Sequence, residues 1–304
     1  MIFQDILNKK HQIIQPEFDK LLGICEQNQT HYGDLLLVHQ NGFYNPEVHT
    51  WDNVEEKLSP YVMGPGNEGH SEHTHHEFIG KYINGNINTQ SLQDYLESVK
   101  YDSNPADKIQ ALENAEAFSI QQEMLIYLKI WESDAFIKSL YQLARIANSE
   151  AYDWHFKIKE NPNDHNATGS RGEIIRTLIR DKFKTILPQL YNSFKNAYKS
   201  QVRNAIAHSQ YIALGRYITL NNYDKNSKYD TMPSVSYNDW IDMFHETIVI
   251  YSSYNRLLTA ILNHYHKIAA LNNNLFEIRL NRIDPVISTE YREVQYDPMF
   301  RMWR

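Results

Sequence analysis

Apolar residues recur at helical spacing along most of this 304-residue chain, and this periodicity limits its fold more than any other feature. Apolar side chains that return every three or four residues form one face of a helix, which must pack against a neighbour. The pattern therefore predicts a mainly α-helical protein. The predicted helices cover residues 2–26, 106–157 (long enough for two helices), 174–187, 189–214 and 236–270.

Prolines, glycines and capping residues predict where the helices begin and end. Pro16 is expected to break the first helix, and residues 60–76 are expected to form a loop because they are rich in Pro and Gly. Gly215 is a suitable C-cap for the helix before it. Ser236 and Asp239 have the spacing of a capping box, which indicates a helix start.

Short strands are predicted late in the chain. Residues 216–221 include the β-branched and aromatic residues that favour strands, and residues 275–283 and 286–296 are strand-like. These segments predict a small β element near the C-terminus of a mainly helical protein.

Charge divides the chain into two parts. Residues 1–150 hold 10 Lys and Arg against 22 Asp and Glu, whereas residues 151–304 hold 20 against 15. The turn-rich segment 160–170 is the best boundary between them. We therefore expect an acidic, mainly helical domain of unknown role at residues 1–160 and a basic helical bundle with a β appendage at residues 161–304. The basic part suits an anionic partner such as nucleic acid, although charge also fluctuates along any protein chain.

Cysteine content and hydropathy favour a cytoplasmic protein. Cys25 is the one cysteine, which excludes an internal disulfide. The first residues lack the charged-then-apolar order of a signal peptide, and no apolar stretch is long enough to span a bilayer. We expect no membrane association.

A group of polar residues is predicted to share one face of the helix at residues 189–214. With about 100° of rotation per residue, Arg203, Asn204, Tyr211 and His208 fall on one stripe, opposite a buried apolar face. Asn204 and His208 are four residues apart, so Asn204 can hydrogen-bond the imidazole and set its tautomer. The stripe is a candidate catalytic site.

A basic ridge is predicted beside this stripe. Lys195, Lys199 and Arg203 step by four residues, and residues 171–203 hold eight Lys or Arg against two acids. Such a ridge suits a phosphate backbone. Lys195, Lys199 and Tyr211 are therefore candidate RNA-binding residues, with Tyr211 either stacking on a base or packing.

The segment Val-Arg-Asn-Ala-Ile-Ala-His at residues 202–208 resembles the signature of the HEPN superfamily. That signature is Arg, a polar residue, a few further residues and then His, and Arg203, Asn204 and His208 fill its positions. The resemblance covers about residues 165–270. It implies a helical bundle that dimerises across the Arg203/His208 face and cleaves RNA without a metal or other cofactor. It also implies a role in a toxin–antitoxin or antiviral defence system, including abortive infection, with an antitoxin or defence protein as a partner. In some relatives a modified Tyr follows the His by two positions, whereas Tyr211 follows by three.

The chemistry of these residue types fits RNA cleavage. RNA carries its own nucleophile, the 2′-hydroxyl. A histidine such as His208 can move protons near neutral pH, and Arg203 can hold the scissile phosphate and stabilise transition-state charge. The expected products are a 2′,3′-cyclic phosphate and a 5′-hydroxyl from single-stranded or loop RNA.

Two other interpretations remain open. The first is a non-catalytic HEPN module that binds a partner protein or a nucleotide. The second is a metal-dependent hydrolase centred on His70, His73, His75 and His76, which lack the His-Glu-x-x-His order of zinc hydrolases. A solvated or partner-facing loop is the alternative for this histidine cluster.

Overall fold

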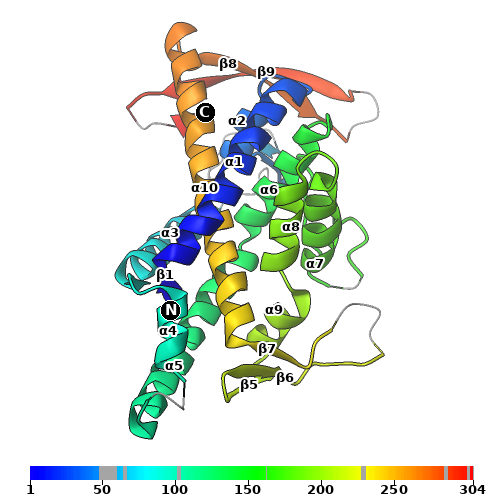
Figure 1. The fold of residues 1–304 in the computed structure, drawn as a ribbon. Coiled ribbons are helices and arrows are strands. Elements are labelled where there is room, and N and C mark those ends of the chain that lie inside the picture. Colours follow the sequence, from blue (N-terminus) through cyan, green and yellow to red (C-terminus); the bar gives the residue numbers. More distant parts are fainter. Residues whose placement is uncertain are drawn as a thin grey trace. The chain divides into compact units, whose positions relative to one another are not determined.

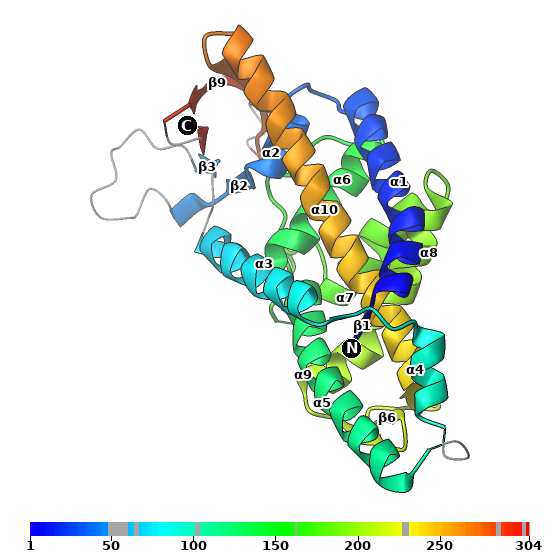
Figure 2. The same ribbon diagram turned by 60° about the vertical axis from the view of Figure 1, so that its left-hand side comes forward.

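The computed structural model confirms a mainly α-helical fold with small β elements (Figures 1 and 2). It describes residues 1–47, 60–63, 67–100, 104–161, 163–226, 231–283, 287–299 and 302–303. The helices among them are α1 (Gln4–Asn28), α2 (Asp34–His39), α3 (Asn67–Gly85), α4 (Leu92–Ser98), α5 (Ala106–Trp131), α6 (Asp134–Ala147), α7 (Arg171–Glu173), the π-helix η3 (Ile174–Arg180), the 3-10 helix η4 (Asp181–Phe183), α8 (Pro188–Ala197), α9 (Ser200–Ala207) and α10 (Tyr237–Leu271). No described helix is long and apolar enough to cross a membrane.

The strands form small, mostly antiparallel sheets. β5 (Tyr211–Leu214), β6 (Tyr217–Leu220) and β7 (Ser234–Ser236) make one three-stranded sheet, and β8 (Leu275–Asn281), β9 (Thr289–Asp297) and β10 (Met302–Trp303) make another. Two short pairs join β1 (Ile2–Phe3) to β4 (Ile87–Asn88) and β2 (Phe43–Tyr44) to β3 (Tyr61–Val62). The strands predicted at 216–221, 275–283 and 286–296 correspond to β6, β8 and β9.

The chain divides into two compact units, each assembled from three segments. Unit 1 contains residues 1–17, 73–133 and 189–253, and unit 2 contains residues 18–72, 134–188 and 254–304. Both units take segments from each side of residue 160. The compact units therefore do not coincide with the predicted division at that residue, because segments distant in sequence pack into one core.

Aromatic side chains fill the core of unit 1. The Trp131 ring lies 6.2 Å from that of Phe194 and 5.1 Å from that of Tyr198, and its indole Nε1 donates to Thr247 Oγ1 at 3.3 Å. Trp131 ends α5, while Phe194 and Thr247 lie on α8 and α10. Burial of such large rings ties these three helices together.

Helix α6 is the centre of unit 2. Nearly all of its residues from Phe136 to Ala147 are buried, and it packs against α2 and η3. The Phe136 ring meets Tyr254 edge-on at 4.9 Å. A helix that is covered on nearly all sides is typical of a domain core.

Two expectations about loops and breaks were wrong. Pro16 lies inside α1 rather than ending it, because burial of Ile14, Phe18 and Leu21 along one face outweighs the lost backbone hydrogen bond. Residues 67–76, expected to be part of a loop, form the first half of α3.

The helix predicted at residues 189–214 is also wrong in its extent. The segment is split into α8, α9 and strand β5, with an interruption at residues 198–199. The hydroxyl of Tyr127 on α5 binds the backbone groups at the first break, and Ser209 in the left-handed region ends α9 before β5. The two helices predicted within 106–157 are confirmed as α5 and α6, and the capping box is confirmed by a 3.1 Å hydrogen bond from Asp239 N to Ser236 Oγ.

A buried histidine makes the stability of unit 1 sensitive to acid. His245 Nε2 accepts from Phe3 N at 2.8 Å, and its Nδ1 lies 2.7 Å from Ile241 O, to which it donates. Burial lowers the pKa of His245 to about 4, because the charged imidazolium is poorly solvated there. This group therefore stabilises the fold above pH ~6.5, and that contribution is lost as pH falls through about 4.

We predict that His245 alone lowers the free energy of unfolding by about 3 kcal/mol between pH 7 and pH 4. The measurement is urea unfolding at a series of pH values, for wild type and His245→Gln. The variant should lose this part of the pH dependence, whereas His165→Gln, at an exposed position, should keep it. Parallel pH profiles for all three proteins would contradict the assignment.

Candidate functional site

The hydroxyl of Tyr127 joins the end of α8 to the start of α9. Tyr127 Oη donates to Ala197 O at 3.0 Å and accepts from Lys199 N at 3.1 Å. It is fully buried on α5. Because both backbone groups find their partner in one side chain, the helical ladder can be interrupted there without leaving them unsatisfied. This contact sets where α9 begins.

Removal of this hydroxyl is predicted to destabilise the protein. Tyr127→Phe leaves the Lys199 amide without its acceptor and weakens the bonding of the Ala197 carbonyl, at a cost of about 1–3 kcal/mol. Chemical denaturation measures the loss. Tyr217→Phe, at an exposed tyrosine on β6, is the control and should change stability by less than about 0.5 kcal/mol. Equal stabilities for the two variants would contradict the role given to Tyr127.

His208 lies at the C-cap of α9. His208 N donates to Asn204 O at 3.0 Å, Ser209 N to Ile206 O at 3.2 Å and Gln210 N to Ala205 O at 2.7 Å. With Ser209 in the left-handed region at φ 53°, this is a Schellman motif. It ends the helix and turns the chain into β5. His208 is therefore exposed at the helix end rather than in the middle of a longer helix.

The left-handed conformation of Ser209 predicts a stabilising substitution. A side chain in this region is strained, so Ser209→Gly should raise the free energy of unfolding by about 0.5–1 kcal/mol. Gly215, at φ 57° with open space around its missing side chain, provides the reverse control. Gly215→Ala should lower stability by a similar amount in the same thermal or urea assay. A destabilised Ser209→Gly protein would contradict this account of the helix end.

Arg203 is half-buried and paired with an acidic residue from another helix. Its Nη1 lies 3.0 Å from Glu132 Oε1, and the two side chains are 17% and 33% exposed. Glu132 is the C-cap of α5, next to the buried Trp131. Helix α9 packs against α5, which brings the pair together (Figure 2). The ion pair to the end of α5 thus orients the Arg203 guanidinium.

The predicted site residues are brought together only in part. Arg203, Asn204 and His208 lie on or at the end of α9, as expected. Among the described residues, no hydrogen bond joins the Asn204 side chain to the His208 imidazole, and their link is the backbone bond at the helix end. The proposed orientation of His208 by Asn204 stays a prediction.

The predicted basic ridge does not follow one continuous helix. Lys195 lies on α8, while Lys199 is the extended N-cap of α9, so Lys195 and Arg203 belong to different helices. Lys199 Nζ donates to Lys195 O at 2.7 Å. The Tyr127 contact interrupts the helix between the two lysines. The lysines remain near the start of α9, and their binding to RNA stays a prediction.

Tyr211 does not share the helical stripe. It is the first residue of β5, and its Oη donates to Gln121 Oε1 on α5 at 2.6 Å. The structure thus replaces the predicted helix face with a hairpin anchored on α5. At the turn of that hairpin, Arg216 Nη2 lies 2.9 Å from the buried Glu116 Oε1. Burial raises the pKa of Glu116 to about 6, although the Arg216 charge acts in the opposite direction.

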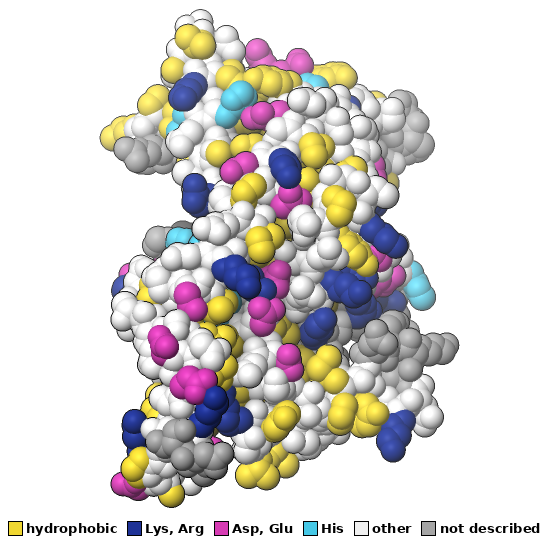
Figure 3. All heavy atoms as spheres, in the orientation of Figure 1, with side chains coloured by type: hydrophobic (Ala, Val, Ile, Leu, Met, Phe, Trp, Pro, Cys, Tyr) yellow, Lys and Arg dark blue, Asp and Glu magenta, His cyan; other side chains and the backbone are white. Residues whose placement is uncertain are grey.

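The hairpin carries an exposed apolar face. Leu214 and Tyr217 are direct cross-strand partners, and Ile212 lies two residues before Leu214 on the same face. All three are exposed. In Figure 3 hydrophobic side chains gather over the β5–β6 region. This apolar surface lies on the strands that follow His208 in the sequence.

Sequence reasoning missed Tyr127 and Glu132. Each acts on α9 from α5, about 70 residues earlier in the chain. The sequence carried one usable signal, an acidic residue at the end of a helix, where the macrodipole disfavours negative charge. A charge in an unfavourable place often has a partner that only the fold reveals.

The histidine cluster lies on helix α3 rather than in a loop. The side chains of His70 and His73 fall outside the described residues, whereas those of His75 and His76 are described. Burial lowers the pKa of His75, and the nearby Lys129 adds to this effect. Within the part of the chain that is described, no three His, Cys, Asp or Glu side chains are grouped to hold a metal ion.

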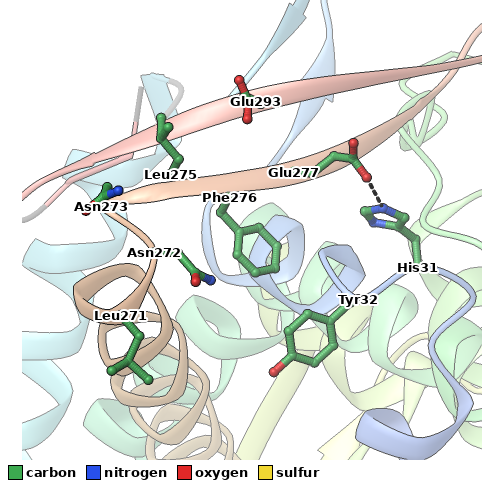
Figure 4. A pocket seen from close by; sticks show the side chains of 9 residues that line it. All are labelled: His31, Tyr32, Leu271, Asn272, Asn273, Leu275, Phe276, Glu277 and Glu293. Carbon is green, nitrogen blue, oxygen red and sulfur yellow. Dashed lines mark ion pairs between the residues drawn. The ribbon is translucent and has the colours of Figure 1, made fainter.

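An open hollow of about 570 Å³ lies in unit 2 (Figure 4). His31 points to Glu277 across 3.5 Å, and Glu293 faces Glu277 from the neighbouring strand as its direct cross-strand partner. Tyr32 and Phe276 supply an aromatic wall. The paired carboxylates would repel a phosphate, so this hollow does not suit a nucleotide.

A search of protein-family models, of characterised proteins and of solved structures found no match to this chain. The likeness to HEPN proteins therefore depends on residues 202–208 and on the helical setting of that segment.

Proposed function

We propose that this protein is a metal-independent endoribonuclease whose site is formed by Arg203, Asn204 and His208. The strongest support for this proposal is the arrangement of side chains at the end of α9. There an exposed histidine at the C-cap lies within two helical turns of an arginine whose guanidinium is held in place. These are the two groups that metal-free cleavage of RNA requires.

The proposed reaction uses the substrate's own 2′-hydroxyl. His208 takes or returns the proton of the attacking and leaving oxygens, and Arg203 donates to the phosphate oxygens, where negative charge builds up. The products are a 2′,3′-cyclic phosphate and a 5′-hydroxyl. Lys195, Lys199 and Tyr211 contribute to binding of single-stranded or loop RNA. In a homodimer formed across the Arg203/His208 face, the second histidine serves the other proton transfer.

The cellular role that fits this activity is that of a toxin or antiviral defence effector in the cytoplasm. The support for this role is the resemblance at residues 202–208, and an antitoxin or defence protein would be its partner. Unless it were restrained, a ribonuclease acting on cellular RNA would arrest growth.

The test is cleavage of total cellular RNA in the presence of EDTA. We predict that His208→Ala slows cleavage by about 10²–10⁴-fold because proton transfer is lost, and that Arg203→Ala slows it by about 10²–10³-fold. His165→Ala removes an exposed histidine elsewhere and should leave the rate unchanged. Gel or sequencing readouts give the rates.

The alternatives predict different outcomes. If neither wild type nor variant cuts RNA, the non-catalytic binding module becomes the better interpretation. If cleavage stops with EDTA, a metal site is responsible, and the His70–His76 cluster is the first to substitute. If wild type and His208→Ala cut equally well, the proposed site is wrong.

A further inference from the structure

We propose that Glu132 is a competing anion that occupies Arg203 until a phosphate of the bound RNA displaces it. This inference rests on the proposed function, because it concerns the arginine that would hold the scissile phosphate. Glu132 is a positioning residue in this scheme, since it acts on RNA only through Arg203.

The geometry of the pair supports competition. Glu132 Oε1 takes one guanidinium nitrogen, Nη1, at 3.0 Å. The Nε of Arg203 is shielded from solvent and has no hydrogen-bond acceptor among the described residues. A guanidinium offers donors along two edges and prefers a bidentate partner such as a phosphate. The contact to Glu132 therefore leaves part of its donor capacity unused.

The position of Glu132 makes the pair easy to exchange. Its carboxylate lies at the C-terminal end of α5, where the helix dipole is negative and disfavours a second negative charge. Arg203 offsets that charge in the free protein. An incoming phosphate carries charge of the same sign as Glu132 and binds the same cation, so the two anions compete for it. The Glu132 side chain is 33% exposed, although the Oε1 atom that meets Arg203 is shielded from solvent, so release requires the side chain to rotate outward.

The ion pair with Glu132 is expected to weaken the binding of RNA to Arg203. In the free protein the Arg203 charge is neutralised by Glu132. RNA must break this ion pair in order to bind Arg203, which reduces the net binding free energy. Removal of the carboxylate charge should therefore strengthen binding. An ion pair of this exposure is worth about one kcal/mol, which corresponds to about fivefold in affinity.

The experiment measures binding of a fluorescein-labelled, mixed-sequence, single-stranded 2′-O-methyl RNA by fluorescence anisotropy. Methylation blocks the attacking oxygen, so binding is observed without cleavage. We expect Glu132→Gln to bind about fivefold more tightly than wild type. Glu132→Asp keeps the carboxylate and should bind like wild type. Asp107→Asn removes the same charge from an exposed position on α5 and should change affinity less than twofold.

A double substitution separates this effect from a general change in charge. Glu132→Gln should give no gain in an Arg203→Ala background, because the competition acts through that arginine. Unchanged or weaker binding by Glu132→Gln would overturn the inference, and so would an equal gain without Arg203. If the oligonucleotide binds wild type and loses affinity in Arg203→Ala, yet Glu132→Gln has no effect, this inference fails while the proposed RNA site stands. If no variant binds it, both fail.

Discussion

The hydroxyl of Tyr127 is the contact on which the candidate site depends. One buried group satisfies the last carbonyl of α8 and the amide that precedes α9, so a single amphipathic stretch becomes two helices. The interruption sets where α9 begins, and the Schellman motif at Ser209 ends the helix, so that His208 caps it instead of lying on its face.

Other side chains of helix α5 position the β5–β6 hairpin and the middle of α9. Along its length it contacts the hairpin turn through Glu116, the start of β5 through Gln121, the start of α9 through Tyr127 and the middle of α9 through Glu132. A rigid helix with several anchor points can hold a short helix and a hairpin in register. Sites supported in this way hold their side chains more firmly than sites on free loops.

The sequence predicted the helical class and most of the elements, because apolar periodicity and local capping signals depend on neighbouring residues. Ser236 and Asp239 marked the start of α10 correctly. The interruption at residues 198–199 could not be predicted, since its cause lies about 70 residues away on α5. The end of α9 could not be predicted either. Ser209 adopts the left-handed conformation that usually marks a helix end by a glycine, but the sequence has a serine there.

The candidate site was predictable in its residue types but not in its electrostatics. Arg203, Asn204 and His208 could be chosen from their spacing alone. Tyr211 was placed on the wrong kind of element, and the partner of Arg203 could not be inferred without the fold. The pairing of Arg203 with Glu132, and the competition with phosphate that we propose for it, depend on a contact between distant segments that no local pattern carries.

The proposed function requires the RNA's own 2′-hydroxyl to be the nucleophile at the end of α9. The most direct measurement uses an oligonucleotide that spans a mapped cut site and carries a single 2′-deoxy substitution at the position before the cut. We predict that this one substitution abolishes cleavage there, while the unmodified RNA is cut in EDTA to a 2′,3′-cyclic phosphate. Cleavage of the substituted RNA at the same position and rate would contradict it.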